Sequence, residues 1–214
     1  MERIVLKFGG TSLGNTEKIL SVARIIQQKH KSSIEIIVVV SAMSGVTNDL
    51  VEQSKKISSD FEKAELDALL SSGEQASSAL LAAAIVKLGI KSRSWLSWQI
   101  PILTEGNFGS SRILHIETKK INDFIKSGGI PIIPGFQGVS KDFRLTTLER
   151  GGSDSSAVAI AKFFQADYCE IFTDVDGVYT TDPNINTKAK KIEKISYDEM
   201  LEMSSLGAKV MQPN

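Results

Sequence analysis

The sequence predicts an α/β fold in which a mostly parallel sheet is sandwiched by helices. Short apolar runs alternate with longer segments of helical periodicity along the 214 residues. Most of these runs are apolar at consecutive positions, as in parallel strands that are covered on both faces. This alternation favours a parallel sheet with helices on both sides. In such sheets ligands bind at the carboxyl ends of the strands, so we expect the functional site there.

Five strands and seven helices are expected. The strands are residues 4–8, 34–40, 94–98, 130–133 and 168–173. Pro131 and Pro134 fit this assignment poorly, because proline cannot donate a ladder hydrogen bond. The helices are residues 16–28, 46–57, 61–70, 73–88, 115–126, 153–164 and 196–203.

Helix-end signals support several of these boundaries. Thr47 is a candidate N-cap, and Ser72 opens a capping-box pattern before the helix at 73–88. Gly89 is typical of a left-handed helix stop, and Ser196 with Glu199 forms a second capping box. No repeat or linker interrupts the pattern, so we expect one domain over residues 1–214.

Composition excludes several classes of function. The 25 basic and 25 acidic residues balance, so no positive field favours nucleic acid as a partner. A single cysteine, Cys169, and two histidines, His30 and His115, offer neither a disulfide nor zinc-ligand spacing. The longest apolar run, residues 79–86, is too short for a membrane span, and no export signal begins the chain. We expect a cytoplasmic protein with no membrane partner.

The first strand ends in a glycine-rich turn that opens a helix, at residues 7–16. The turn resembles a Walker A loop, but Asn15 occupies the position of the required lysine, so that assignment fails. Lys7 instead lies upstream, at the strand end, where it and the glycine-flanked amides favour binding of a phosphate. A tight strand-to-helix turn with an extended lysine remains the structural alternative.

Similar corners follow other strands. Residues 41–48 and 134–138 are rich in small or glycine residues, and residues 150–154 lead into a helix. Arg150 suits bidentate capture of a carboxylate or phosphate, although a surface salt bridge would also explain it. Asp154 and Glu74 each lie near an expected helix start and could simply complement the helix dipole. Residues 173–183 fail as an EF-hand, because its first and twelfth ligands would be Phe172 and Pro183.

These segments together resemble aspartokinase, a member of the amino acid kinase superfamily. The resemblance rests on residues 7–12 (KFGGTS), 39–48 (VVSAMSGVTN), 72–74 (SGE), 146–154 (TTLERGGSD), 173–183 (TDVDGVYTTDP) and 205–213 (SLGAKVMQP). It implies transfer of the ATP γ-phosphoryl group to the β-carboxylate of L-aspartate, with Mg²⁺, giving 4-phospho-L-aspartate. That reaction is the first step of lysine, threonine, methionine and diaminopimelate biosynthesis. The resemblance also implies a homo-oligomer, a dimer.

The resemblance assigns a role to each matched residue. Catalysis falls to Lys7 and Asp154, and the amino-acid pocket comprises Ser41, Thr47, Glu74, Arg150 and Ser153. Nucleotide and phosphate contacts fall to Lys7, Gly9, Gly10, Ser12, Thr173, Asp174, Tyr179, Asp182 and Lys209. The metal ligands are not assigned.

The chain departs from the family pattern in three places. Glu149 replaces a common glycine and could compete for Arg150, and Asn184 stands where the family often has an arginine near the phosphates. We also expect the catalytic domain to be incomplete at its C-terminal end and the ACT regulatory domains to be absent. Two alternatives therefore stay open. One is a catalytically silent ligand-binding fragment or subunit, and the other is a superfamily kinase for a different acceptor.

Overall fold

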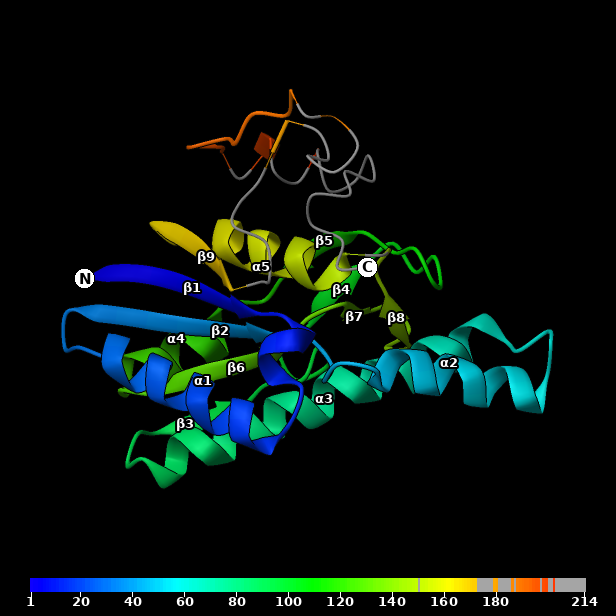
Figure 1. Ribbon diagram of the computed structural model, residues 1–214, viewed down its shortest axis with the longest axis horizontal. Coiled ribbons are helices and arrows are strands. Elements are labelled where there is room, and N and C mark those ends of the chain that lie inside the picture. The colour runs from blue at the N-terminus through cyan, green and yellow to red at the C-terminus, as the bar shows by residue number, and fades with distance from the viewer. Residues whose placement is uncertain are drawn as a thin grey trace.

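A five-stranded parallel sheet forms the centre of the molecule, with the strand order β3-β6-β2-β1-β9 (Figure 1). The computed structural model describes residues 1–149, 151–172, 179–180, 186, 188–196, 198–199 and 202. The strands are β1 (Glu2–Phe8), β2 (Ile34–Val40), β3 (Ser92–Ser94), β6 (Ile130–Pro134) and β9 (Tyr168–Phe172). The predicted parallel sheet is therefore confirmed, including the proline-containing strand β6.

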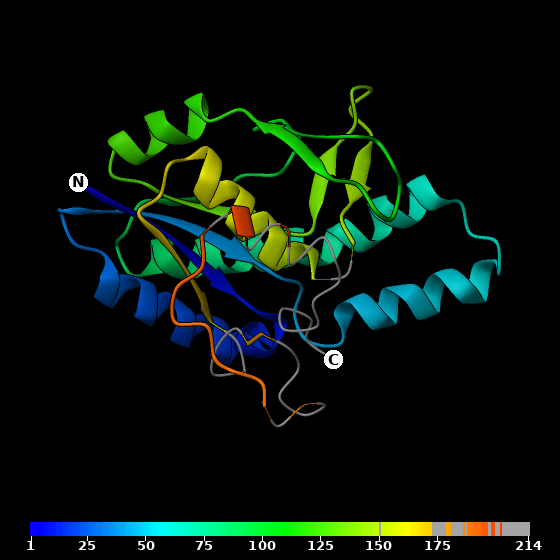
Figure 2. The same ribbon diagram turned by 90° about the horizontal axis from the view of Figure 1, so that it is seen from above.

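Helices cover both faces of this sheet (Figure 2). The helices α1 (Thr16–Lys29) and α3 (Lys63–Lys87) pack on one face, and α4 (Lys119–Lys126) and α5 (Gly152–Phe163) pack on the other. Neighbouring residues of one strand divide between the two cores: Leu6 belongs to the α1 and α3 side and Val5 to the α4 and α5 side. Side chains alternate along a strand, so burial on both faces requires the consecutive apolar residues seen in the sequence.

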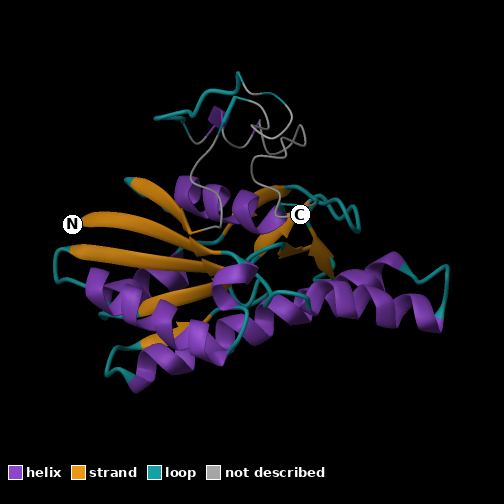
Figure 3. Cartoon of the chain, viewed as in Figure 1, coloured by secondary structure: helices purple, strands orange, loops and turns teal. Residues whose placement is uncertain are grey.

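A second, four-stranded sheet was not predicted (Figure 3). Its order is β5-β4-β7-β8, from β4 (Ile102–Thr104), β5 (Ile113–Ile116), β7 (Gln137–Val139) and β8 (Leu145–Thr147). Strands of three or four residues are too short to show a period in the sequence. The helix expected at 115–126 consequently begins only at Lys119, because the residues before it pair with β4.

The helix α3 is continuous, whereas the sequence predicted two helices that met at residues 71–73. Ser72 does not cap a helix, since its Oγ donates to the carbonyl of Leu69 at 2.6 Å. Gly73 lies inside the helix, and a glycine is needed there because a Cβ would come within 2.9 Å of the Ala42 Cβ. The predicted stop is confirmed: α3 ends at Lys87, and Gly89 has a φ of +81°.

Other boundaries were shifted or replaced. The helix α2 (Val46–Ile57) has the predicted bounds, but Gly45, with a φ of +88°, occupies the cap position that was expected of Thr47. The strand expected at 94–98 is β3, because the chain leaves the sheet after Trp95 donates its amide to Ile132. The capping box of Ser196 and Glu199 is confirmed at 2.9 Å and 3.3 Å, while much of the helix expected at 196–203 lies outside the described residues.

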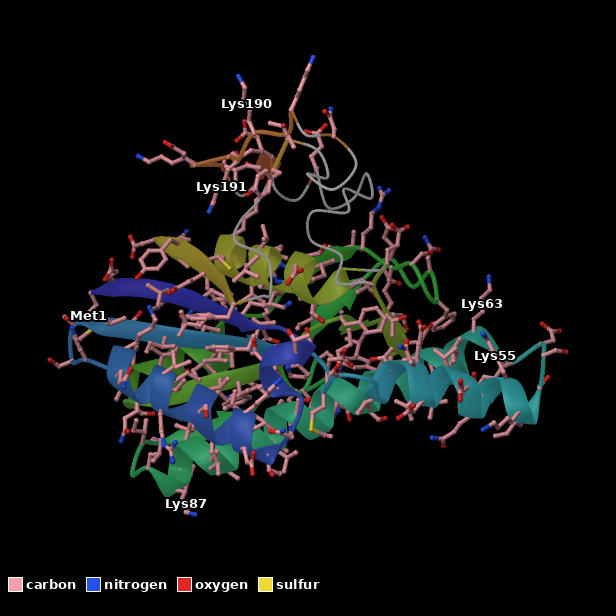
Figure 4. All side chains as sticks on the ribbon, viewed as in Figure 1. Met1, Lys55, Lys63, Lys87, Lys190 and Lys191 are labelled. Atoms are coloured by element: carbon pink, nitrogen blue, oxygen red, sulfur yellow. The ribbon has the colours of Figure 1, made fainter. Side chains whose placement is uncertain are left out.

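The helices α2 and α3 form a hairpin that extends beyond the sheet, with Lys55 and Lys63 near its tip and Lys87 at the opposite end of α3 (Figure 4). Within the described residues α3 alone is long and apolar enough to pass for a membrane-spanning helix. However, 56% of its most apolar window is buried inside the fold, as expected of a core helix.

Candidate active site

The carboxyl ends of the strands converge at one edge of the parallel sheet. Backbone hydrogen bonds tie the first residue after each strand to its neighbour. Ser41 donates to Phe8 at 3.1 Å, and Gly135 donates to Val40 at 2.9 Å. The glycine-rich corners expected on a common sheet edge therefore lie there together.

A buried ion pair lies at this edge. Lys7, from the end of β1, is 3% exposed, and its Nζ pairs with Oδ1 of Asp154, which is 5% exposed in the first turn of α5. Asp154 Oδ1 forms this ion pair but no hydrogen bond within the described residues. Burial raises the pKa of the Asp154 carboxyl, and the charge of Lys7 opposes that rise. Desolvating two charges is costly, so such a pair is more often functional than stabilising.

Glu74, on α3, is the second buried carboxyl group of the site. Burial raises its pKa to about 7, while a backbone hydrogen bond with Ala42 and the charge of Lys7 act in the opposite direction. Its Oε2 has no hydrogen-bond partner among the described residues. A buried oxygen without a donor is costly, so this carboxyl group is prepared to receive a donor from a ligand.

Close backbone packing brings these groups together. A Cβ at Gly10 would come within 2.8 Å of the Ala42 carbonyl, and one at Gly135 within 2.9 Å of Ser153. Gly10 opens a short 3-10 helix (Gly10–Leu13). These two glycines therefore let the loops after β1 and β6 approach their neighbours more closely than a side chain would allow.

Hydroxyl groups at the strand ends differ from those in the core. Ser156 and Thr147, which are fully buried, both donate hydrogen bonds. Four predicted site residues have half-buried hydroxyl groups that form no hydrogen bond with another described residue. They are Ser12, Ser41, Thr47 and Ser153. These four groups are therefore available to a ligand.

One predicted donor needs correction. The amide of Gly9 already donates to the carbonyl of Phe172 at 3.1 Å, as part of the contact between β1 and β9. Gly9 instead leaves space beside the lysine, since a Cβ there would lie 3.6 Å from the Lys7 Nζ. Gly10 is the first residue of the 3-10 helix, so its amide has no acceptor within that helix. The Gly10 amide therefore remains a candidate donor to a phosphate.

Several predicted site residues lie outside the described residues. They are Arg150, Thr173, Asp174, Asp182 and Lys209, and Asn184 belongs to the same group. Tyr179 is described and forms an antiparallel bridge with Lys191. Glu149, expected to compete for Arg150, is exposed. Among the described residues, no three His, Cys, Asp or Glu side chains cluster as metal ligands.

Two ionisable side chains received no functional role from the sequence. Cys169, on β9, lies within the electrostatic field of Asp154 and Lys7, and burial raises the pKa of its thiol to about 12. Asp67, on α3, is 1% exposed and binds strand β8. In the sequence it looks like any polar residue of a helix, so only the fold reveals its partners.

Curated relatives show what the chain resembles. It is 48% identical over 213 residues to the aspartokinase of Bacillus sp. strain MGA3, covering 100% of this chain and 52% of that protein. It is 46% identical to the aspartokinase of Rickettsia conorii, of which it covers 54%. The chain thus spans about half the length of the curated relatives it matches, and the predicted resemblance to aspartokinases is confirmed.

Solved structures of aspartate kinases are also similar to this chain. The aspartate kinase from Synechocystis is 42% identical with a TM-score of 0.75, over 97% of this chain and 34% of that one. The E. coli aspartokinase III in complex with aspartate and ADP is 26% identical with a TM-score of 0.79, over 98% and 57%. The model of the amino acid kinase family matches residues 2–214. Because that match covers nearly the whole chain, the chain belongs to the amino acid kinase family.

Proposed function

We propose that this chain carries the phosphoryl-transfer site of an aspartate kinase, a phosphotransferase with a carboxyl group as acceptor. The observation that carries the proposal is the buried Lys7–Asp154 pair beside the buried Glu74, at the edge where the parallel strands end. The names of the similar proteins support the same activity. The proposed reaction converts ATP and L-aspartate to ADP and 4-phospho-L-aspartate, the first step of lysine, threonine, methionine and diaminopimelate biosynthesis.

The chemistry needs charge neutralisation more than proton transfer. An oxygen of the aspartate β-carboxylate attacks the γ-phosphorus, and the bond from that phosphorus to the bridging oxygen breaks to release ADP. The nucleophile is already an anion, so no general base is required. Lys7 supplies a cation to the transferring oxygens, and its burial strengthens this interaction because little water screens it. Asp154 holds the ammonium of Lys7 in place through their ion pair.

A zwitterionic amino acid needs one fixed anion and one fixed cation. Glu74 provides the anion for the substrate ammonium, which would supply the donor that Oε2 lacks. Arg150 is the proposed cation for the α-carboxylate. The hydroxyl groups of Ser41, Thr47 and Ser153 complete this pocket.

The nucleotide side combines Lys7, the Gly10 amide and the Ser12 hydroxyl with residues that follow β9. The latter are Thr173, Asp174, Tyr179, Asp182 and Lys209. Mg²⁺ in kinases is bound by one or two carboxylates together with the substrate phosphates. Asp154 fits that requirement, since its carboxylate lies beside Lys7 at the expected phosphate position. Asp154 would hold the Mg²⁺, which supplies further neutralisation of phosphate charge. The homodimer remains a prediction from the resemblance, and the cytoplasmic location remains a prediction from composition.

The test is a coupled assay of ADP release by the 214-residue chain with ATP, Mg²⁺ and L-aspartate. Hydroxylamine trapping of the acyl phosphate separates transfer from simple ATP hydrolysis, and Lys7→Ala is the control. We expect aspartate-dependent formation of hydroxamate, and we expect it to fall by about two orders of magnitude or more in Lys7→Ala. Turnover only with N-acetylglutamate or UMP would indicate a different kinase of the family. Binding of aspartate without any turnover would indicate a silent fragment, and either outcome would refute the proposal.

A further inference from the structure

The carboxylate of Asp67 is buried in α3, far from solvent and outside the set of residues described above as binding substrate. It is 1% exposed and accepts three hydrogen bonds. Its Oδ2 accepts from the amides of Thr147 at 2.8 Å and Gly109 at 2.9 Å, and its Oδ1 accepts from the Thr147 hydroxyl at 2.6 Å. It forms no ion pair with any described cation.

The partner Thr147 is the last residue of β8 and is itself 1% exposed. Its carbonyl accepts from the amide of Ser111 at 3.0 Å, and the next residue, Leu148, donates to Phe136 at 2.9 Å. Asp67 is therefore a buried hydrogen-bonded contact between α3 and the end of β8, from which the chain leads into α5 and Asp154.

Asp67 and Glu74 lie seven residues apart on the same helix. Seven residues are close to two turns, so both side chains lie on one face of α3, roughly 10 Å apart along its axis. Under the proposed function, Glu74 holds the substrate ammonium and Arg150, three residues after Thr147, holds its carboxylate. The helix α3 thus carries Glu74 directly and, through Thr147, contacts the strand from which the chain leads to Ser153 in the first turn of α5.

We propose that Asp67 is a positioning residue for the amino-acid substrate. Through its hydrogen bonds to Thr147 it fixes the end of β8, from which the chain leads to α5, and so fixes the position of the pocket residue Ser153 relative to Glu74. This inference rests on the proposed function. The role depends on hydrogen-bond geometry, because every partner of this carboxylate is an N–H or O–H donor.

Thr147→Val tests the role, because valine keeps the shape of threonine and removes only the hydroxyl donor. We expect the KM for aspartate to rise roughly 5- to 20-fold, while kcat and the KM for ATP change less than about twofold. Thr147→Ser retains the hydroxyl and should restore the original KM. Asp67→Asn should raise the KM for aspartate less than about threefold. The asparagine oxygen still accepts from both amides, and its NH₂ group can donate to the Thr147 hydroxyl.

Two further measurements separate positioning from stability. Hydrogen exchange at residues 145–152 should accelerate in Thr147→Val and not in Thr147→Ser, while the melting temperature falls by only about 2 to 4 °C. A lower kcat with an unchanged KM for aspartate in Thr147→Val would overturn the positioning role and leave the proposed function intact. Absence of aspartate-dependent turnover in the unmodified chain would refute the proposed function, and the positioning role with it.

Discussion

Glu74→Gln should change how the stability of the protein depends on pH. Burial raises the pKa of Glu74 from 4.5 to about 7 in the folded protein, whereas the unfolded chain exposes the group to water. Between these two values the folded state binds a proton that the unfolded state has lost. The stability from this group is therefore fully present below pH 4.5 and is lost as the pH rises through 7.

The size of the effect follows from the shift. A difference of one pKa unit corresponds to about 1.4 kcal/mol, so a rise from 4.5 to about 7 corresponds to about 3 kcal/mol in total. Most of this change falls between pH 5 and pH 8. Glutamine cannot ionise, so Glu74→Gln should not lose this stability. Between pH 5 and pH 8, its free energy of unfolding should therefore rise by roughly 2 to 3 kcal/mol relative to that of the unmodified protein.

The assay is urea unfolding at pH 5, 6, 7 and 8 for the unmodified chain, Glu74→Gln and a matched control, Glu52→Gln. Glu52 lies exposed on α2, so its replacement removes a carboxylate without changing the buried site. The control should follow the unmodified chain at every pH. Parallel stability curves for Glu74→Gln and the unmodified chain would show that Glu74 is not held in a desolvated site, and would refute this reasoning.

Three further predictions concern activity. Lys7→Ala should lower kcat by about two orders of magnitude or more through lost charge stabilisation, and an unchanged kcat would remove Lys7 from catalysis. Arg150→Lys retains charge but loses the planar fork, so the KM for aspartate should rise by the equivalent of about 1 to 3 kcal/mol, and an equal effect on ATP would contradict the assignment. Cys169→Ala should keep full activity, because burial raises the pKa of this thiol to about 12 and keeps it protonated. Rapid inactivation of the folded protein by a thiol reagent would argue against that.

The parts of the fold that the sequence predicts are those in which local pattern and burial agree. β1 and β2 are buried on both faces, and their continuous apolar runs show it directly. β4, β7 and β8 have three residues each, which is too short for a period to show, so no local pattern indicates them. The false break in α3 has the opposite cause. Ser72 and Gly73 form a plausible helix start locally, but Gly73 serves close packing against Ala42 and lies inside a continuous helix.

The candidate site likewise contains residues that the sequence indicates and a residue that it does not. Lys7 and Asp154 lie near glycines at the end of a strand and the start of a helix, and Glu74 follows Gly73 inside α3. This pattern is readable because close backbone approach requires glycine. Asp67 carries no such mark. Its importance depends on Thr147, which is 80 residues away in the sequence and meets it only in the folded chain. Pattern reasoning therefore finds residues that face the ligand more readily than residues that hold them.

The buried charges of the site also explain why an ammonium group is its expected ligand. Among the described side chains, Lys7 is the cation at the strand ends, and its ion pair is with Asp154. Glu74 lies in the field of that same lysine, yet its Oε2 finds no donor there, so the folded chain favours the protonated form until the pH approaches 7. A substrate ammonium would replace that proton, donate to the unpaired oxygen and restore the charge balance. Burial of Glu74 thus lowers the stability of the free protein at neutral pH, and binding of the ligand recovers that free energy as affinity.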